Sequence, residues 1–331
     1  MIKTLKYSEI DIEQWQNLAK ISPFSSYFQT KECYDFFSSL SFLEQFVFGV
    51  EENEKLVGIV CGYIVADGGK IKRFFSRRAI IAGGALLDEN ISEKALQTLL
   101  NFTVKSLKNR AIYIEIRNYN DYSLFKNVFA ESGFIYNEHL NFHIATPNVE
   151  YVQSKMSSGK IRDIKLTQKN GAEIVEISQE NDLKFFYEIL KKLYQTRVKM
   201  PLFPYEFFEK IAKLPECKIF GIKYQNEIIG GSVCVIFNQH TVYEWFACGL
   251  DGKFKNIYTS TLATYSGINY AAENGFARFD MMGAGKPDED YGVRDFKAKF
   301  GGNSVENGRF LYICKPILYK FGKKIISIIR K

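Results

Sequence analysis

An internal repeat constrains this chain more than any other feature of its sequence. The pattern Tyr-x-Phe-Phe occupies residues 34–37 and returns 171 residues later at 205–208. Two apolar triplets separated by five residues occupy 48–58 and return 172 residues later at 220–230. Two copies of so long a repeat indicate a duplicated domain, because solenoids are built from several shorter repeats.

Each copy of the repeat combines helices with short strands. After the two shared blocks, a helical pattern leads into an apolar strand, at residues 93–116 in the first copy and 259–282 in the second. We therefore predict an α/β (α+β) fold of two tandem domains, each with a mixed central sheet flanked by helices. The predicted domains span residues 1–148 and 149–310, and a basic amphipathic helix follows at 311–331.

The net charge of +7 is concentrated at the C-terminal end. Residues 309–331 carry seven basic groups and no acidic group, so the other 308 residues hold 37 of each sign. This distribution is not typical of a protein whose surface is basic throughout for duplex binding. Apolar residues from Ile317 to Ile329 recur at helical spacing with lysines opposite. Such a helix can pack on the first domain or lie on an anionic inner membrane surface.

Composition also limits the chemistry and the location that we expect. The six cysteines lie mostly in apolar stretches without a C-x-x-C motif, and the three histidines lack metal-ligand spacing. We therefore expect no metal ion and no histidine-based triad. The longest apolar run, residues 79–87, is too short to cross a bilayer, and the first 15 residues lack a signal-peptide core. A cytoplasmic protein is predicted, with peripheral membrane contact through the basic helix as an option.

The densest group of chemically useful residues follows the last strand of the second copy. Residues 280–302 contain several glycines, four basic residues and three aromatic residues. Glycine lets the backbone approach a ligand closely, and lysine or arginine can stabilise the oxyanion of an acyl transfer. The candidates in this segment are Tyr291, Arg294, Phe296 and Lys297. A solvated surface loop is the alternative interpretation.

Two other segments supply candidate substrate-binding residues. Prolines at 201 and 204 separate two predicted helices, which places Arg197 near the end of one and Tyr205 in the first turn of the next. An arginine at such a place can bind phosphate or carboxylate, or cap its own helix. Tyr243 and Glu244 lie in an apolar strand, where a carboxylate needs a partner, a cleft or a water-facing edge.

At these positions the sequence resembles the Fem-type (FemABX) aminoacyltransferase family, whose fold is two tandem GNAT-like domains. The most specific element is residues 291–302, in which Phe296-Lys297-x-x-Phe300-Gly301 is similar to the F-K-x-x-F-G pattern of the family. The order of the helix with Arg197 and the strands with Tyr243 and Asp280 is similar as well. The internal repeat is what such a duplicated fold would leave in the sequence.

The resemblance implies a reaction and its participants. Family members move an amino acid from aminoacyl-tRNA to an amine of a peptidoglycan precursor, and a related cell-envelope glycan precursor would fit as well. Lys297 would stabilise the carbonyl oxyanion while the amine attacks the ester. The acceptor would be nucleotide- or lipid-linked, and no cofactor, metal ion or covalent enzyme intermediate is implied. The implied substrate-binding residues are Arg197, Tyr205, Tyr243, Glu244, Tyr291, Arg294 and Phe296.

Two alternatives keep this fold and change the activity. A GNAT-type N-acyltransferase would move an acyl group from acyl-CoA to an amino sugar or another small amine, holding the CoA pyrophosphate on a glycine-rich helix N-terminus. The corresponding loop, residues 251–260, contains a single glycine, and the first copy lacks the spacing too, which favours aminoacyl-tRNA as the donor. The other alternative is a binding module that has lost activity, against which the intact pattern around Lys297 argues.

Overall fold

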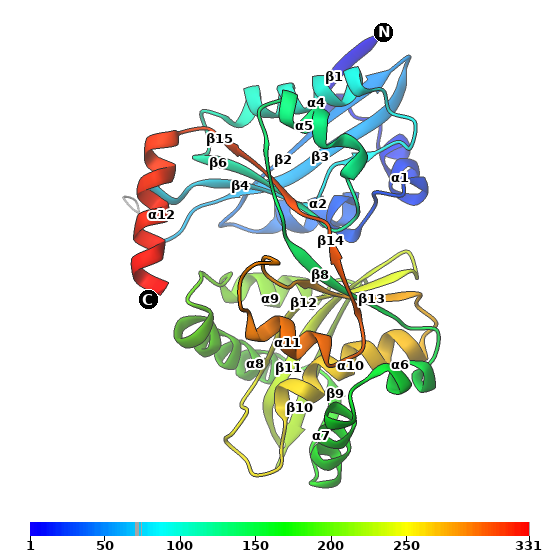
Figure 1. Cartoon of the computed structure of the whole chain (residues 1–331), viewed down its shortest axis with the longest axis vertical. Coiled ribbons are helices and arrows are strands. Elements are labelled where there is room, and N and C mark those ends of the chain that lie inside the picture. The colour runs from blue at the N-terminus through cyan, green and yellow to red at the C-terminus, as the bar shows by residue number, and fades with distance from the viewer. Residues whose placement is uncertain (70–72, 74, 331) are drawn as a thin grey trace. The chain divides into compact units, whose positions relative to one another are not determined.

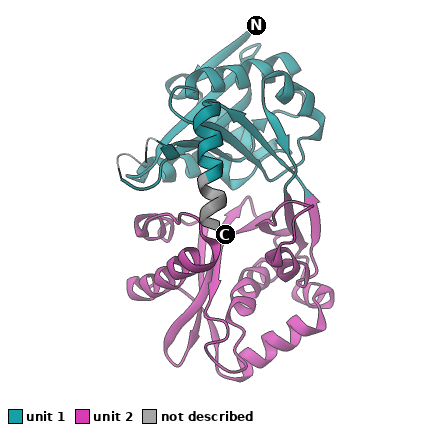
Figure 2. Cartoon of the chain, turned by 60° about the vertical axis from the view of Figure 1, so that its left-hand side comes forward, with its two compact units in different colours: residues 1–139, 306–331 teal, residues 140–305 magenta. Residues whose placement is uncertain are grey.

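The computed structural model describes the chain except for residues 70–72, 74 and 331 and the side chains of residues 325–330. Two compact units divide the chain: residues 1–139 with 306–331 form the first, and residues 140–305 form the second (Figure 2). Each unit contains one mixed sheet with helices on both faces.

The first sheet has the strand order β1-β2-β3-β4-β6-β15-β7, with β5 paired to β3. Helices α4 and α5 cover one face and α1 and α2 the other. The strands are β1 (Ile2–Lys6), β2 (Glu44–Glu52), β3 (Lys55–Val65), β4 (Arg78–Gly83), β5 (Leu86–Leu87), β6 (Tyr113–Asn118), β7 (Ile135–Asn137) and β15 (Arg309–Ile313). The helices are α1 (Ile12–Ile21), α2 (Lys31–Ser39), α4 (Glu93–Leu107), α5 (Lys126–Glu131) and α12 (Pro316–Arg330).

The second sheet has the strand order β14-β8-β13-β12-β11-β10-β9. Its strands are β8 (Leu140–Ala145), β9 (Glu173–Glu176), β10 (Cys217–Tyr224), β11 (Glu227–Phe237), β12 (Thr241–Gly249), β13 (Arg278–Gly283) and β14 (Asn303–Glu306). Its helices are α6 (Val149–Lys155), α7 (Ser158–Lys169), α8 (Glu180–Leu193), α9 (Tyr205–Ile211), α10 (Thr259–Glu273) and α11 (Gly292–Ala298). Position by position, the second sheet repeats the first, which confirms the predicted duplicated α/β fold.

Local interactions show why both copies fold alike. In the hairpins β2–β3 and β10–β11, both central turn residues have positive φ, at 52° and 65° in one and 51° and 65° in the other. Turns with two such residues match the twist of the flanking strands. A β-bulge follows at the same position in both hairpins, next to Val50 and next to Ile222. Polar caps start several helices, for example Asp11 before α1 and Ser92 before α4.

The two units exchange one strand each. β8 follows the first copy in the sequence but lies between β13 and β14 of the second sheet, and β15 returns to lie between β6 and β7 of the first (Figure 1). The compact units therefore divide at residues 139/140 and 305/306 rather than at the predicted 148/149 and 310/311. Alternating apolar residues predict a strand, but they do not say which sheet the strand joins.

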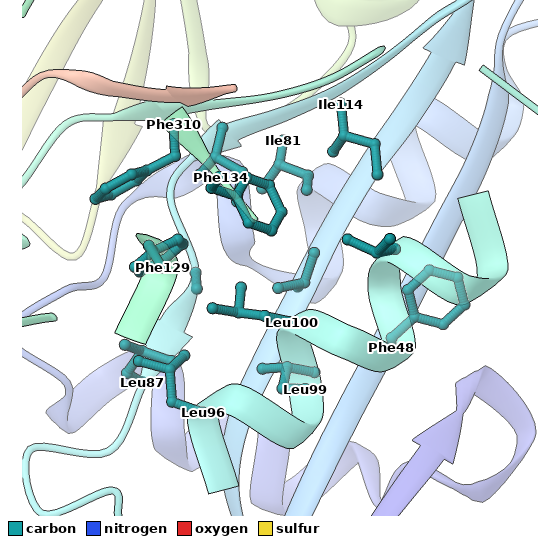
Figure 3. Packing of buried hydrophobic residues seen from close by; sticks show 14 of the residues in the cluster. Phe48, Ile81, Leu87, Leu96, Leu99, Leu100, Ile114, Phe129, Phe134 and Phe310 are labelled. Atoms are coloured by element: carbon teal, nitrogen blue, oxygen red, sulfur yellow. The ribbon is translucent and has the colours of Figure 1, made fainter. Parts of the chain in front are cut away.

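The core of the first unit lies between its sheet and α4. Leu96, Leu99 and Leu100 of α4 are fully buried and pack towards Ile81 and Ile114 of the sheet (Figure 3). Phe310 of the exchanged strand enters the same core, and its ring stacks on Phe129 with centroids 3.9 Å apart. The exchanged strand is thus part of the hydrophobic core that stabilises the first unit.

Ion pairs also hold β15 in the first sheet. Arg309 lies directly opposite Arg117 of β6, and both bind the carboxylate of Glu115. Arg117 Nε donates to Glu115 Oε2 at 2.7 Å and Arg309 Nη1 to Oε1 at 3.2 Å. Burial by itself would raise the pKa of Glu115, but the two arginines outweigh it and lower the pKa to about 2. One carboxylate therefore balances two half-buried cations.

Helix α12 belongs to the first unit. The ring of Tyr319 packs edge-on against Tyr113 of β6, with centroids 5.5 Å apart. Two of its apolar side chains remain uncovered, since Ile317 is 85% and Phe321 57% exposed. Among the described residues, no helix is long and apolar enough to cross a membrane.

Candidate active site

The second sheet opens at a place where the first stays closed. β12 and β13 are parallel and pair from Thr241–Arg278 to Tyr243–Asp280, but they form no ladder beyond these positions. The equivalent strands of the first unit, β4 and β6, remain paired as far as Gly83. The carboxyl ends of β12 and β13 therefore leave a gap between them, the kind of place where α/β sheets bind ligands.

Lys297 of α11 fills part of this gap. The side chain is buried, and Nζ donates hydrogen bonds to the backbone oxygens of Met281 and Gly283, the latter at 2.9 Å. An ammonium group has three N–H donors, so one remains after these two bonds. The helix thus fixes a positive charge with a free donor at the end of β13.

An irregularity in β13 presents both carbonyl groups to Lys297. The register between β13 and β8 shifts between Asp280 and Gly283, and Met282 has a φ of +58°. Asp280 Oδ1 accepts the N–H of Met282 at 2.7 Å, which stabilises this backbone conformation. Such strained residues cluster at functional sites.

Two buried carboxylates accompany the lysine. Burial lowers the pKa of Lys297, and the negative charges of Glu244 and Asp280 act in the opposite direction. Burial raises the pKa of Glu244, which the charge of Lys297 partly offsets. Glu244 Oε1 is buried without a hydrogen-bond partner among the described residues. Buried, mutually coupled acids and bases of this kind mark candidate active sites. The described residues contain no cluster of metal-ligating side chains.

Tyr291 and Arg294 shape the loop in front of α11. Arg294 donates from Nη1 to the backbone oxygens of Lys286 at 2.5 Å and Pro287 at 3.3 Å, and from Nη2 to that of Glu289. Tyr291 precedes the first residue of α11 and is 42% exposed. Arg294 therefore ties the preceding loop to α11, and its predicted contact with the acceptor stays a prediction.

Phe296 packs inward against a second buried lysine. Lys160 Nζ lies 3.8 Å from the centroid of the Phe296 ring and 4.8 Å from that of Phe300, and donates to Thr261 Oγ1 at 2.7 Å. Burial lowers the pKa of Lys160 to about 8. This clamp joins α7, α10 and α11 and positions the helix that carries Lys297. Phe296 thus has a packing role in addition to the predicted substrate contact.

The other predicted residues divide into two groups. Tyr243 is fully buried and lies in register with Asp280, so it belongs to the group around the gap. Arg197 lies on the exposed π-helical end of α8 (Tyr194–Val198), and Tyr205 begins α9, both as the proline spacing predicted. Tyr205 packs against Tyr187 with ring centroids 5.4 Å apart. No contact in the described part of the chain joins Arg197 or Tyr205 to Lys297.

Sequence reasoning missed three residues of the site: Asp280 as a partner of Lys297, Lys160, and His143. His143 Nε2 lies 3.2 Å from Asp280 Oδ2, across the β8–β13 ladder. The available signal was the alternation along β8, where Asn141 and His143 interrupt apolar residues and share one face. The partner of His143 could not be predicted, because β8 was assigned to the first domain.

The two glycines after α11 let the helix end pass closely over its neighbours. Gly301 has a φ of +84°, and a Cβ there would collide with the carbonyl group of Lys155. A Cβ on Gly302 would approach the side chain of Ile144 and the backbone oxygen of His143. The glycine of the F-K-x-x-F-G pattern is thus explained by packing.

Gly301→Ala is expected to destabilise the protein by roughly 2–4 kcal/mol, because the new side chain adds both backbone strain and a collision. Chemical denaturation would measure this change. Gly292→Ala is the matched control, since Gly292 begins α11 and has no atom near its Cβ position. Equal stability of the two variants would contradict the packing explanation.

The N-terminus of α10 already holds a negative charge. Asp251 Oδ1 accepts the N–H of Ser260 at 3.0 Å in the first turn of the helix. Without Asp251, the free N–H groups and the helix dipole at the N-terminus of α10 would favour a phosphate group there. The carboxylate of Asp251 opposes a pyrophosphate at this position.

Comparisons with known proteins agree with this fold. The model of the FemAB family matches residues 205–326. Among solved structures, FemX has a TM-score of 0.70 and 15% identity, covering 96% of this chain and 99% of its own. A tandem GNAT protein from the clavulanic acid biosynthesis pathway has a TM-score of 0.61 and 9% identity, covering 95% and 99%. L-PGS from Bacillus licheniformis has a TM-score of 0.58 and 11% identity, covering 97% and 98%.

These comparisons establish the fold and support the family resemblance. At such low identities the structural likenesses establish the fold alone, which is the predicted pair of tandem GNAT-like domains. The match to the family model includes Lys297 and the closing glycine pattern. The match to the family model and the tandem GNAT-like fold confirm the resemblance to the Fem-type family that was inferred from the sequence. A comparison with curated proteins by sequence finds no match.

Proposed function

We propose that this protein moves an amino acid from aminoacyl-tRNA to an amine of a cell-envelope precursor, either of peptidoglycan or of a related glycan. The observation that carries the proposal is the ammonium group of Lys297, which two backbone oxygens fix in the β12–β13 gap. A fixed cation in a buried site stabilises negative charge that develops during acyl transfer.

The third N–H of Lys297 would supply this stabilisation. As the acceptor amine attacks the ester carbonyl, the carbonyl oxygen gains negative charge and can accept a hydrogen bond from Nζ. The ammonium group is prevented from turning away by Met281 and Gly283, so little reorganisation is needed during the reaction. The Lys160 clamp on Phe296 would keep α11 in the matching position.

The helix end at Asp251 favours aminoacyl-tRNA over acyl-CoA as the donor. A CoA pyrophosphate at the N-terminus of α10 would meet the carboxylate that accepts Ser260 N–H. The phosphates of an aminoacyl-tRNA are spread along an extended chain, so its binding does not depend on the N-terminus of α10. Arg197 is exposed and could contact a phosphate or carboxylate of either substrate.

A paired donor assay tests the proposal. Purified protein would be offered labelled aminoacyl-tRNA or labelled acetyl-CoA, each with extracted nucleotide-linked and lipid-linked envelope precursors, and mass spectrometry would identify the products. Label that arrives from tRNA would support the proposal and name the amino acid. Label that arrives from CoA alone would instead make the protein a GNAT-type N-acyltransferase.

A lipid-linked acceptor would require contact with the inner membrane face, and α12 is suited to this. Ile317 and Phe321 are one helical turn apart and exposed, next to Lys320 and Lys324. Apolar and basic side chains together favour an anionic lipid surface.

Substituting both Ile317 and Phe321 with serine should reduce cosedimentation with phosphatidylglycerol-containing vesicles several-fold. Point substitutions are preferable to truncation at residue 310, which would remove most of β15 from the first sheet. Leu124→Ser is the control, because Leu124 is 84% exposed but lies outside α12. If the serine double variant bound vesicles as well as the control, α12 would have no part in membrane contact.

A further inference from the structure

Three neighbouring strands of the second sheet bring a histidine, an aspartate and a tyrosine side by side. His143 of β8 pairs with Asp280 of β13, which in turn pairs with Tyr243 of β12. The residues that alternate with them, among them Phe142 and Phe279, belong to the apolar core with α10. Side chains alternate between the faces of a strand, so the three polar residues share the opposite face.

The geometry of the pair fixes the roles of its atoms. Asp280 is fully buried, and its Oδ1 accepts the N–H of Met282 at 2.7 Å, so the carboxylate cannot rotate freely. Oδ2 lies 3.2 Å from His143 Nε2, within ion-pair distance, although neither of these two buried atoms makes a hydrogen bond in the described part of the chain. Nδ1 is not among the buried unpartnered atoms and makes no hydrogen bond within the described part of the chain. The histidine side chain is 17% exposed.

We propose that His143 is the base that takes the proton from the attacking amine, with Asp280 as its positioning residue. This inference rests on the acyl transfer proposed above and adds a catalytic residue to it. A proton on Nε2 faces the Asp280 carboxylate, which leaves the lone pair of Nδ1 on the accessible side. An imidazole beside a buried carboxylate can act as a general base.

The proton balance of the reaction is complete with this residue. The neutral amine nitrogen forms a bond to the carbonyl carbon, and the C–O bond of the ester breaks. The surplus proton on nitrogen passes to Nδ1, and the imidazolium can return it to the departing ribose oxygen. Neither an oxidant nor a further reactant is needed.

Asp280 links the proposed base to Lys297. Its charge acts on the ammonium of Lys297, and its Oδ2 faces His143. The other titratable or charged groups that neighbouring elements bring to this region are Tyr243 and Glu244 on β12 and Arg278 on β13. An amine that reaches the pair from the open face would therefore find the base and the oxyanion donor coupled through one carboxylate.

His143→Gln tests the inference, because glutamine keeps hydrogen-bonding capacity and cannot act as a base near neutral pH. The pH dependence of kcat/KM would be measured with the donor that labels product in the paired assay. We expect a loss of about 10²-fold at neutral pH, together with loss of the acidic limb of the profile. Asp280→Asn should also slow the reaction, since the neutral amide no longer places a negative charge beside the imidazole.

Several controls keep the result interpretable. His240→Gln replaces a histidine in the β11–β12 turn and should leave the profile unchanged. Added imidazole should partly restore His143→Ala, which a purely structural role would not allow. A folded His143→Gln protein with wild-type kcat/KM and an unchanged acidic limb would overturn the inference. Failure of the wild-type protein with every donor would refute the proposed function instead.

Discussion

The Lys297→Ala protein is expected to transfer its acyl group about 10²–10³ times more slowly than the wild type, as when one oxyanion donor is removed. The ammonium group is held at the mouth of the β12–β13 gap with one N–H unused. Its loss removes the fixed positive charge from the reacting carbonyl. Single-turnover kinetics would show the effect as a lower rate constant for chemistry.

Stability must be measured beside activity, because the alanine also leaves two carbonyl groups without their partner. We expect a cost of about 1–3 kcal/mol from this, which thermal unfolding would report. Lys299→Ala is the matched control: Lys299 lies just after α11 and is exposed. Lys299→Ala should change neither the transfer rate nor the stability appreciably. A folded Lys297→Ala protein with the wild-type rate would remove Lys297 from the mechanism.

Glu115→Gln is expected to destabilise the protein by about 3–5 kcal/mol at pH 7. The substitution leaves Arg117 and Arg309 as half-buried cations without a balancing charge, which costs more than a lost surface ion pair. Urea denaturation would give the difference in free energy of unfolding.

Glu44→Gln provides the matched control. Glu44 also binds two arginines, Arg77 at 2.8 Å and Arg110 at 2.7 Å, but its side chain is 49% exposed. We expect less than about 1 kcal/mol from this exposed cluster. Similar losses in the two variants would show that burial does not strengthen the pairing around Glu115.

The contribution of Glu115 also depends on pH in a defined direction. Its pKa is about 2 in the folded protein against an ordinary value of 4.5, a difference that corresponds to roughly 3 kcal/mol. Because the folded-state pKa is the lower one, this stabilisation is present above pH 4.5 and is lost as the pH falls towards 2. The difference in free energy of unfolding between the wild type and Glu115→Gln should therefore become smaller below pH 4.5.

Local patterns predicted the repeated part of the fold, since hairpin turns, bulges and helix caps depend on neighbouring residues. The exchange of β8 and β15 was not predictable in this way. Phe310 and Ile116 become neighbours in the sheet although 194 residues separate them in the sequence. Alternation predicts that residues 140–145 form a strand, but the choice of sheet depends on which edge remains open after the rest has folded.

The site was predictable to a different degree for each residue. The glycine-rich pattern around Lys297 carries its own signal, because the backbone needs those glycines to pass Lys155 and His143. The pairing of Lys297 with Asp280 and Glu244, and of Asp280 with His143, carries no such signal, since these residues come together through the arrangement of strands. Phe296 shows the opposite case: the motif identifies it, but only the structure reveals Lys160 against its ring.

The exchanged strands also determine when this protein can fold during synthesis. β15 lies between β6 and β7, so the first sheet is incomplete until residues 309–313 have left the ribosome. β8 is synthesised before the other strands of the second sheet. The second sheet is therefore complete once β14 has been made, before β15 completes the first sheet. Domains generally fold in the order of their synthesis. In this protein, the domain that is synthesised first is completed last. Until then its unpaired edges at β6 and β7 are open to aggregation or to chaperones.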